Sequence, residues 1–390
     1  MSVYFDADHE LFRREYRRFV ENEVAPVAAE ADRAGAFPLE VLRSLGKHGY
    51  LCVQLPERYG GASGDVMMLL VAAEEMAYAS SGIDASLLVH SIISVNPIYR
   101  FGSEQQREHY LPGAAAGRLV GAIAMTEPDA GSDVASIRTT ARADGDTYVL
   151  NGTKMFITNG SIADFVVVAA RTGPPGHRGI SLFIVDTNRE GFKVARRLDK
   201  LGWRASDTAE LVFEDCVVPA DSLIGEPGRG FYYLMENLNL ERIVMAADCL
   251  GLARAAIDQA KQYAMHRKQF GVPIASFQDI RFMIVDMETA LRSAELLTYD
   301  AGWKLQHGER CTLEASMARY VAGEMVNRVT GNAIQIHGGY GFMMESDVQR
   351  FYRDARVMTI GGGTSQIQKE VIARELGLAV GHSGVGEGRK

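Results

Sequence analysis

The chain has 390 residues, with 41 Lys or Arg and 49 Asp or Glu, which gives a formal charge of −8. This length predicts two or three domains, and 47% apolar with 23% charged residues is typical of a globular chain, not a fibrous or disordered one. The excess of acid argues against a nucleic-acid partner or an anionic membrane surface.

The amino-terminal segment and the cysteines bear on location. The first twenty residues mix arginines with acidic residues, which fits neither a signal peptide nor an acid-poor transit peptide. No apolar run approaches the roughly 18 residues of a membrane span. Four scattered cysteines without a C-x-x-C pair predict reduced thiols and no disulfide framework. We therefore expect a cytoplasmic protein without a membrane span.

The first two thirds of the chain divide into a helical and a strand-rich part. From Phe5 to about Tyr110 apolar residues recur at helical spacing, which predicts an all-α domain over residues 1–120. Short β-branched runs then predict an antiparallel β domain over residues 121–226. Its expected strands are Leu119–Ala124, Thr147–Leu150, Phe165–Ala170, Ile180–Val185 and Leu211–Val218. Turns between such runs are expected at Asp144-Gly145, Asn151-Gly152 and Asn159-Gly160.

Helical spacing returns in the last third. Long segments starting at Phe231, Phe277, Thr312 and Thr364 are joined by short loops, which predicts a four-helix bundle over residues 227–380. Residues 381–390 are rich in Gly and polar residues and are expected to form a disordered tail. The order helices, strands, helices indicates an α+β protein and not βαβ alternation.

Several well-known chemistries lack their motifs in this chain. No G-x-G-x-x-G follows an amino-terminal strand and no P-loop is present, which argues against a Rossmann nicotinamide site and P-loop nucleotide chemistry. The nine histidines are isolated, and neither H-E-x-x-H nor G-x-S-x-G occurs. We therefore expect no metal site and no serine nucleophile elbow.

Two segments of the β domain could bind a flat polar ligand. The loop Met125–Asp133 should expose backbone N–H groups and hydroxyls, although Ser132 or Asp133 could equally be a helix N-cap. In the run Lys154–Gly160, Phe156 and Thr158 alternate onto one strand face. They could flank an aromatic cofactor, or the phenylalanine could be ordinary core.

Glu241 is the candidate general base. It lies on a helix face whose neighbours, Leu234, Asn237, Leu238, Val244 and Met245, include no cation. Burial there would raise the pKa of its carboxyl toward the value a base needs near neutral pH. The alternative is a structural ion pair with an arginine of another helix.

Three further segments carry cations or glycines near helix ends. Arg267-Lys-Gln-Phe-Gly271, with Gln278, could meet a pyrophosphate or could be a solvated helix end. A second glycine cluster lies in Gln335–Gly341. In Ile360–Gln366 three glycines precede a helix, where free N–H groups attract an anion or a carbonyl oxygen. Capping by Thr364 alone would not need three glycines.

Taken in chain order, these segments resemble the acyl-CoA dehydrogenase family. The shared motifs are T-E-P-x-A-G-S-D, K-x-x-I-T-N-G, R-x-x-F-G-x-x-I-x-x-F-Q, Q-x-x-G-G-x-G-F/Y and R-D-A…G-T-S-Q-I. The resemblance runs over nearly the whole chain. It implies a helical, a β and a four-helix domain, usually in a homotetramer that binds FAD between domains and across a subunit interface.

The resemblance also implies roles for individual residues. The residues it assigns to FAD are Met125, Thr126, Gly131, Ser132, Phe156, Thr158, Arg267, Phe270, Gln278, Gln335, Gly339, Thr364 and Gln366. Some of these are expected to reach the cofactor of a neighbouring subunit. The residues expected to contact substrate are Ser132, Phe231, Met235 and Arg242. At position 156 the family often has tryptophan.

One departure from the family pattern bears on mechanism. Many members carry the catalytic glutamate in a Tyr-Glu-Gly-Thr run, where this chain has Gly361-Gly362-Gly363-Thr364. The isovaleryl-type and long-chain-type branches place it in a Leu-Glu-Arg setting on the first bundle helix, which Glu241 occupies. The resemblance thus implies that Glu241 removes the α-proton while the β-hydride passes to the flavin. The Gly362 N–H would bind the thioester carbonyl.

The expected activity is α,β-dehydrogenation of an acyl-CoA, with electrons passed to an electron-transferring flavoprotein. Gly362 leaves room for branching, and the resemblance to the isovaleryl-type branch implies short or branched acyl chains. Leu88–Ile98 is expected to line the tail end of the site. Three alternatives stay open: a carrier-protein thioester as substrate, a flavin oxidase, and an inactive family member used as a binding module.

Overall fold

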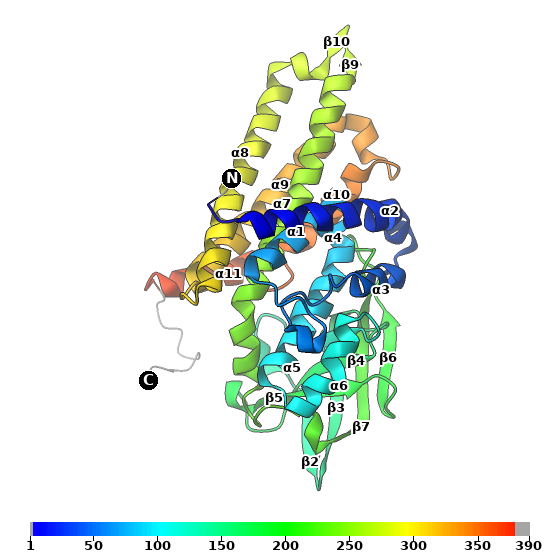
Figure 1. Cartoon of the computed structure of the whole chain (residues 1–390), viewed down its shortest axis with the longest axis vertical. Coiled ribbons are helices and arrows are strands. Elements are labelled where there is room, and N and C mark those ends of the chain that lie inside the picture. Colours follow the sequence, from blue (N-terminus) through cyan, green and yellow to red (C-terminus); the bar gives the residue numbers. More distant parts are fainter. Residues whose placement is uncertain (1–2, 379–390) are drawn as a thin grey trace.

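A helical layer, a β-sheet and a second group of helices follow one another along the computed structural model, which describes residues 3–378 (Figure 1). This order confirms the predicted fold class. The tail predicted at residues 381–390 lies outside the described residues.

The amino-terminal part is helical, as predicted. Asp6 and Ser103 cap the first and last of its helices, each through a capping box. Two π-helical turns, η1 (Val20–Val24) and η3 (Val89–Ser94), join consecutive helices, and a short 3-10 turn, η2 (Glu57–Tyr59), follows the third. The helices are α1 (Ala7–Phe19), α2 (Ala25–Ala34), α3 (Leu39–Lys47), α4 (Val66–Leu88), α5 (Val95–Phe101) and α6 (Glu104–Ala115).

The stretch Val66–Phe101, which contains α4 and α5, is long and apolar enough to cross a membrane by composition alone. The expectation that no apolar run approaches the length of a membrane span does not hold for this stretch. In the structure, 78% of its apolar window is buried inside the protein. It is therefore the central core helix of the amino-terminal part.

The middle part is one eight-stranded sheet with the order β6-β7-β3-β2-β4-β5-β8, and β1 pairs with β4. Most neighbours are antiparallel, as predicted, but β1 runs parallel to β4, and Thr140 of β2 pairs with Arg171 of β4 in parallel. The strands are β1 (Gly121–Ala124), β2 (Thr140–Asp144), β3 (Thr147–Thr158), β4 (Phe165–Arg171), β5 (Ile180–Asp186), β6 (Phe192–Arg197), β7 (Thr208–Pro219) and β8 (Leu223–Ile224). Short 3-10 turns between them are η4 (Val134–Ser136), η5 (His177–Gly179) and η6 (Ala220–Ser222).

Two of the three predicted turns are present. Gly145 has φ +61° between β2 and β3, and Asn159 has φ +64° after β3. The turn predicted at Asn151-Gly152 is wrong, because these residues lie inside β3 at an irregularity in its pairing with β7. The Asn151 side chain accepts a hydrogen bond from the Asp215 N–H at 2.8 Å. That contact accommodates the irregularity without ending the strand.

The carboxy-terminal part contains the four predicted helices and one short helix that was not predicted. The hairpin of β9 (Lys268–Gln269) and β10 (Val272–Pro273) joins the first two helices. The helices are α7 (Gly230–His266), α8 (Gln278–Gln306), α9 (Thr312–His337), α10 (Asp347–Ala355) and α11 (Ser365–Glu375). Its 3-10 turns are η7 (Ile274–Ser276), η8 (Gly338–Phe342) and η9 (Arg356–Thr359).

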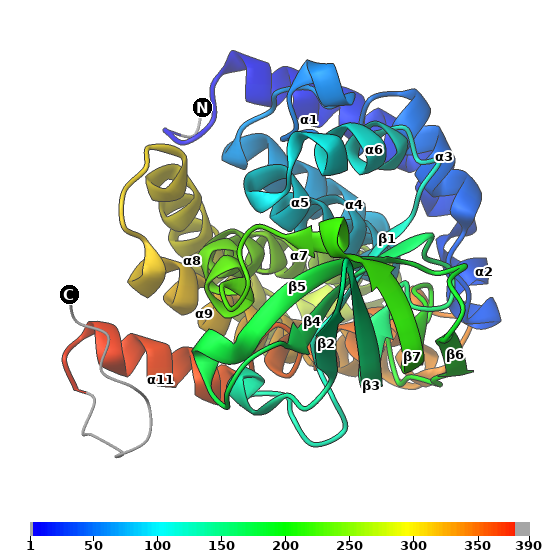
Figure 2. The same cartoon turned by 90° about the horizontal axis from the view of Figure 1, so that it is seen from below.

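Helix α7 connects all three parts. It runs from beside the sheet to the β9–β10 hairpin (Figure 1), and its start lies with α5 and α6 along one side of the sheet (Figure 2). It packs closely on α4, since a Cβ added at Gly251 would lie 2.1 Å from the Glu74 carbonyl oxygen. Any side chain at position 251 would therefore push the two helices apart. The candidate base on α7 is thus fixed at the junction of the parts.

Candidate active site

Among the described residues, the Glu241 carboxyl accepts one side-chain hydrogen bond and forms no ion pair. The Asn237 side-chain amide donates to Glu241 Oε1 at 2.7 Å. Burial among protein atoms raises the pKa of the Glu241 carboxyl to about 7, although the Asn237 hydrogen bond and the Arg242 charge both lower it. The structural ion pair considered for this residue is therefore not formed, and the carboxyl can exchange a proton near neutral pH.

A chain of side-chain amides orients Asn237. The Gln54 Nε2 group donates to Asn96 Oδ1 at 2.9 Å, and the Asn96 amide donates to Asn237 Oδ1 at 3.1 Å. Because its oxygen is occupied, Asn237 presents its N–H to the glutamate. From the sequence, Asn237 is identified only as a face neighbour of Glu241. The series of amide hydrogen bonds joins residues far apart in the sequence, so no local pattern predicts it.

The triglycine loop lies against the same face of α7. Gly362 has φ +64° and Gly363 has φ +90°, backbone conformations that favour glycine. A Cβ added at Gly362 would lie 2.5 Å from the sulfur of Met245, which is one helical turn beyond Glu241. The triglycine loop therefore lies against α7 one turn beyond Glu241, and Gly362 has no side chain to separate its backbone from Met245.

The end of the loop begins helix α11. Thr364 is its N-cap, since the Thr364 hydroxyl accepts a hydrogen bond from the Ile367 N–H at 3.2 Å. This capping was the alternative interpretation of the loop, and it leaves the left-handed glycines unexplained. Gln368 donates to the carbonyl oxygen of Gly363 at 3.2 Å, while Gln366 is exposed.

A buried ion pair anchors the loop Met125–Asp133 to strand β3. Lys154 Nζ donates to Glu127 Oε1 at 2.8 Å and to the Met125 carbonyl at 3.0 Å, and neither charged side chain is more than 6% exposed. Met125 and Thr126 are partly buried, whereas Gly131 and Ser132 are exposed. Only a three-residue 3-10 turn follows, and Asp133 makes no side-chain cap. The helix N-cap interpretation of this loop is therefore wrong.

Phe156 is not a core residue. Its side chain is 67% exposed, and its backbone has φ +62°, which is unusual for a bulky residue. It lies at the point where the pairing of β3 with β7 shifts between Lys154 and Ile157, as in a β-bulge. The bulge replaces the strict alternation expected for Phe156 and Thr158, and it holds an aromatic ring out from the sheet.

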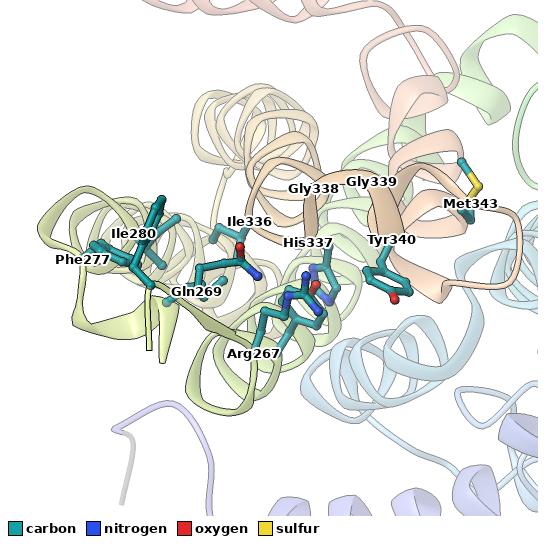
Figure 3. Close-up of a pocket in the computed structure, with 13 residues that line it drawn as sticks. Arg267, Gln269, Phe277, Ile280, Ile336, His337, Gly338, Gly339, Tyr340 and Met343 are labelled. Atoms are coloured by element: carbon teal, nitrogen blue, oxygen red, sulfur yellow. The ribbon is translucent and has the colours of Figure 1, made fainter. Parts of the chain in front are cut away.

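A second group of expected cofactor residues lines a cleft of about 670 Å³ at the far end of α7. Figure 3 shows Arg267 from the end of α7 facing the η8 turn, where its guanidinium lies 5.6 Å from the Tyr340 ring centre. Phe270 and Gly339 line the same cleft. Gln278 and Gln335 are exposed neighbours that do not line it. Arg267 is exposed at the C-cap of α7, and it also lines this cleft.

The two groups of residues are far apart within one chain. Roughly 26 residues of α7 separate Glu241 from Arg267, which corresponds to roughly 40 Å at ~1.5 Å per residue. The structure therefore places the residues expected to bind one cofactor in two separate regions.

Three of the expected substrate residues, Phe231, Met235 and Arg242, lie in the first half of α7, whereas Ser132 lies in the exposed part of the loop Met125–Asp133. Phe231 packs on His177, with 4.2 Å between ring centres, and Met235 and Met125 pack against the same core cluster. Arg242 is buried and donates to Asn239 Oδ1 at 3.1 Å. Leu88, Ser91 and Ile92 of the segment expected at the tail end of the site line a small cavity of about 40 Å³ together with Val244, but none of the expected substrate residues lines it.

Comparison with known proteins gives matches over almost the whole chain. Three family models match: "Acyl-CoA dehydrogenase, N-terminal domain" over residues 6–118, "middle domain" over 122–216 and "C-terminal domain" over 228–377. An acyl-CoA dehydrogenase of Bacillus subtilis is 42% identical and covers 94% of this chain and 97% of its own. The long-chain specific acyl-CoA dehydrogenase of Sus scrofa is 41% identical, covering 95% of this chain and 87% of its own. The structure of butyryl-CoA dehydrogenase from Megasphaera elsdenii superposes with a TM-score of 0.93 at 38% identity, covering 96% of this chain and all of its own.

Proposed function

This chain belongs to the acyl-CoA dehydrogenase family of oxidoreductases, and we propose that it converts an acyl-CoA thioester to the trans-2-enoyl-CoA. The observation that carries the proposal is Glu241. Its carboxyl has a pKa of about 7, and it lies one helical turn from Met245, which contacts the free backbone of Gly362. A base and a hydrogen-bond donor are thus available to the same thioester.

The proposed chemistry follows from these two groups. Glu241 removes the α-proton of the thioester, and Asn237 stabilises the carboxylate before the transfer. The Gly362 N–H donates to the thioester oxygen, where negative charge develops as the α-proton leaves. The β-carbon loses its hydrogen as hydride, so that one C–C single bond becomes a double bond and two electrons leave the substrate.

The residues present fit FAD, which when bound would accept that hydride. Phe156 presents an exposed ring held by strained backbone, beside Thr158 and the loop Met125–Ser132, as a flat ring system requires. Arg267 supplies a cation in the cleft near Gly339, where an added Cβ would meet nothing within 4 Å. A guanidinium facing open backbone suits a pyrophosphate.

We further propose a homotetramer in which the site at Glu241 and the cleft at Arg267 of one chain contact two separate FAD molecules. Since roughly 40 Å separates Glu241 from Arg267 along α7, the cleft at Arg267 would bind part of the FAD whose ring lies in a neighbouring subunit. Exposed apolar side chains around this cleft support such an interface, among them Phe270 at 93% and Phe342 at 76% exposure.

The substrate is proposed to have a short or branched acyl chain. Leu88 and Ile92, from the segment expected to line the tail end of the site, border a small cavity together with Val244, three residues after Glu241. Gly362 carries no side chain, so a branch near the reacting carbons would meet less obstruction.

Steady-state oxidation of a panel of straight, branched and long acyl-CoAs, with an electron-transferring flavoprotein as acceptor, tests the proposal. We expect turnover with short or branched substrates and slow reoxidation by oxygen alone. Turnover only of thioesters on a carrier protein would contradict the CoA assignment. Fast reoxidation by oxygen would indicate an oxidase, and bound FAD that no thioester reduces would indicate a binding module.

A further inference from the structure

A buried arginine holds the backbone of the triglycine loop. Arg319 of α9 is 1% exposed, and its guanidinium donates to two main-chain carbonyl oxygens. One bond goes to Met358 at 2.5 Å and the other to Gly361 at 2.9 Å. These carbonyls lie on either side of the turn that leads into Gly362. A single side chain therefore fixes the entry to the loop.

The second of these contacts falls on the peptide unit that matters for the proposed chemistry. The Gly361 carbonyl and the Gly362 N–H belong to one amide group, and the chain has no cis peptide among its described residues. In a trans peptide the N–H points opposite to the C=O. The Gly362 N–H is therefore aimed away from Arg319 and the core.

That N–H is available to a ligand. Among residues 3–378, no backbone carbonyl accepts a hydrogen bond from Gly362 N, and Gly362 itself is exposed. The Gly362 carbonyl, in contrast, is approached by the Gln368 amide at 3.5 Å. The carbonyl oxygens of Gly361 and Gly362 thus accept hydrogen bonds from side chains, whereas the Gly362 N–H remains free.

The charge of Arg319 is directed at the peptide. Arg319 makes no ion pair within the described part of the chain. Asp248, Cys249 and Arg242 of α7 are the ionisable groups that interact with it electrostatically, and none donates to or accepts from its guanidinium. A cation bonded to an amide oxygen draws electrons from the N–H and strengthens it as a donor, by ~10–30% per bond in a chain of hydrogen bonds. Low polarity around the buried guanidinium increases this effect.

We propose that Arg319 is a positioning residue that orients and polarises the 361–362 peptide, so that the Gly362 N–H stabilises negative charge on the thioester oxygen. This inference rests on the proposed function. The inference goes beyond that function because it attributes the donor strength of the Gly362 N–H to Arg319, a side chain on α9 that does not touch the substrate.

The test compares Arg319→Met and Arg319→Lys with Arg328→Met, a control at an exposed arginine on the same helix. Lysine keeps the charge but cannot bridge both carbonyls. Each FAD-loaded variant is bound to a 2-enoyl-CoA, and the C=O stretching frequency of the bound thioester is measured by Raman spectroscopy. The kcat and KM are measured in parallel.

For the wild type we expect a carbonyl frequency below that of free ligand. Arg319→Met should return the frequency part of the way and lower kcat by about 10–100-fold, less than the ~10²–10³-fold loss for deleting such a donor outright. KM should change far less than kcat, and Arg319→Lys should fall between wild type and Arg319→Met. Arg328→Met should match the wild type in every measurement.

A merely structural arginine would give a different pattern. If Arg319→Met binds FAD and enoyl-CoA with the wild-type carbonyl frequency and a kcat within twofold of wild type, the inference is wrong. If that variant does not fold, an unchanged carbonyl frequency in Arg319→Lys has the same meaning. If neither the wild type nor Arg328→Met oxidises any acyl thioester, the proposed function itself is wrong, whatever the Arg319 variants show.

Discussion

At the scale of single residues, the environment of Glu241 sets the chemistry. Its pKa of about 7 results from burial, which disfavours the carboxylate, against one hydrogen bond from Asn237, which favours it. A carboxyl of ordinary pKa would be a weaker base at neutral pH. The absence of an ion-pair partner within residues 3–378 is thus what suits Glu241 to proton abstraction.

Replacing this carboxyl should abolish most turnover without unfolding the protein. We expect Glu241→Gln to lower kcat by ~10²–10⁴-fold while FAD content and acyl-CoA affinity stay close to wild type, because the amide keeps the shape but cannot accept the proton. Glu236→Gln is the matched control, since Glu236 lies on the same helix in a surface pair with Arg100 at 3.0 Å. Turnover of Glu241→Gln within tenfold of wild type would refute the assignment.

The Asn237 hydrogen bond should be visible in the pH profile. Because the reaction needs the carboxylate, kcat/KM should fall as the pH drops through about 7. Asn237→Ala removes a donor that lowers the pKa of Glu241, so its profile should move to higher pH. The measurement is kcat/KM between pH 5.5 and 9 for both proteins. If kcat/KM falls at the same pH in wild type and Asn237→Ala, the Asn237 amide does not control the pKa of Glu241.

At the scale of elements, the pair Lys154–Glu127 fastens the loop after β1 to strand β3. Burial lowers the pKa of Lys154 to about 8, and Glu127 counteracts this shift. Glu127 also accepts hydrogen bonds from the N–H groups of Arg138 at 2.6 Å and Thr139 at 2.9 Å. The loop expected to hold the flavin and the backbone at Arg138 and Thr139, beyond the η4 turn, are therefore linked by one carboxylate.

Breaking this pair should loosen the loop. Lys154→Met leaves the Glu127 charge buried without its partner, and such a loss typically costs ~3–5 kcal/mol. We expect a lower thermal midpoint and loss of FAD on dilution, and partial recovery of both when Glu127→Gln is added. A double variant less stable than Lys154→Met would contradict this explanation.

The sequence predicted elements best where burial is periodic. The long helices show such patterns, whereas strands β4 and β5 could be predicted as continuous apolar runs because they are buried along almost their whole length. The strands β2 and β6 were missed because nearly all their residues are exposed, and so they carry no alternation. The parallel pairing of β1 with β4 depends on contacts between residues about 44 positions apart, which local pattern does not encode.

The site shows the same division. Glu241 and Gly362 could be selected from an apolar helix face and a glycine cluster, both local signals. The amide chain from Gln54 through Asn96 to Asn237, and the contact of Arg319 with Gly361, exist only after α4, α7 and α9 have packed together. Phe156 was placed on a strand face, but the bulge that exposes it depends on the register with β7.

At the scale of the whole molecule, a buried carboxyl pair makes folding depend on pH. Asp84 of α4 and Asp248 of α7 are both buried, and Ser81 donates to Asp248 at 2.8 Å while accepting from the Trp203 indole at 2.8 Å. Burial raises the pKa of Asp248 to about 7, although its hydrogen bonds with Asp84 and Ser81 lower it, and burial together with repulsion from Asp248 raises the pKa of Asp84 well above its usual value. The pair therefore needs a proton to remain between the helices.

Linkage gives the direction of the effect. The unfolded carboxyls lose their protons near pH ~4, whereas the folded pair holds a proton to about pH 7, so stability should fall as the pH rises between these values. Asp248→Asn cannot ionise and should flatten the dependence of the thermal midpoint on pH between 5 and 8. The exposed Asp199→Asn serves as control. A wild-type slope retained in Asp248→Asn would show that the pair does not control folding.

Anaerobic mixing of the FAD-loaded protein with a short branched acyl-CoA tests the central claim most directly, with flavin absorbance followed in wild type and Glu241→Gln. We predict rapid bleaching of the wild-type flavin and release of the trans-2-enoyl-CoA, and a perturbed but unbleached spectrum when Glu241→Gln binds the same ligand. Wild-type flavin that no acyl-CoA bleaches, or equal bleaching rates in the two proteins, would contradict the account.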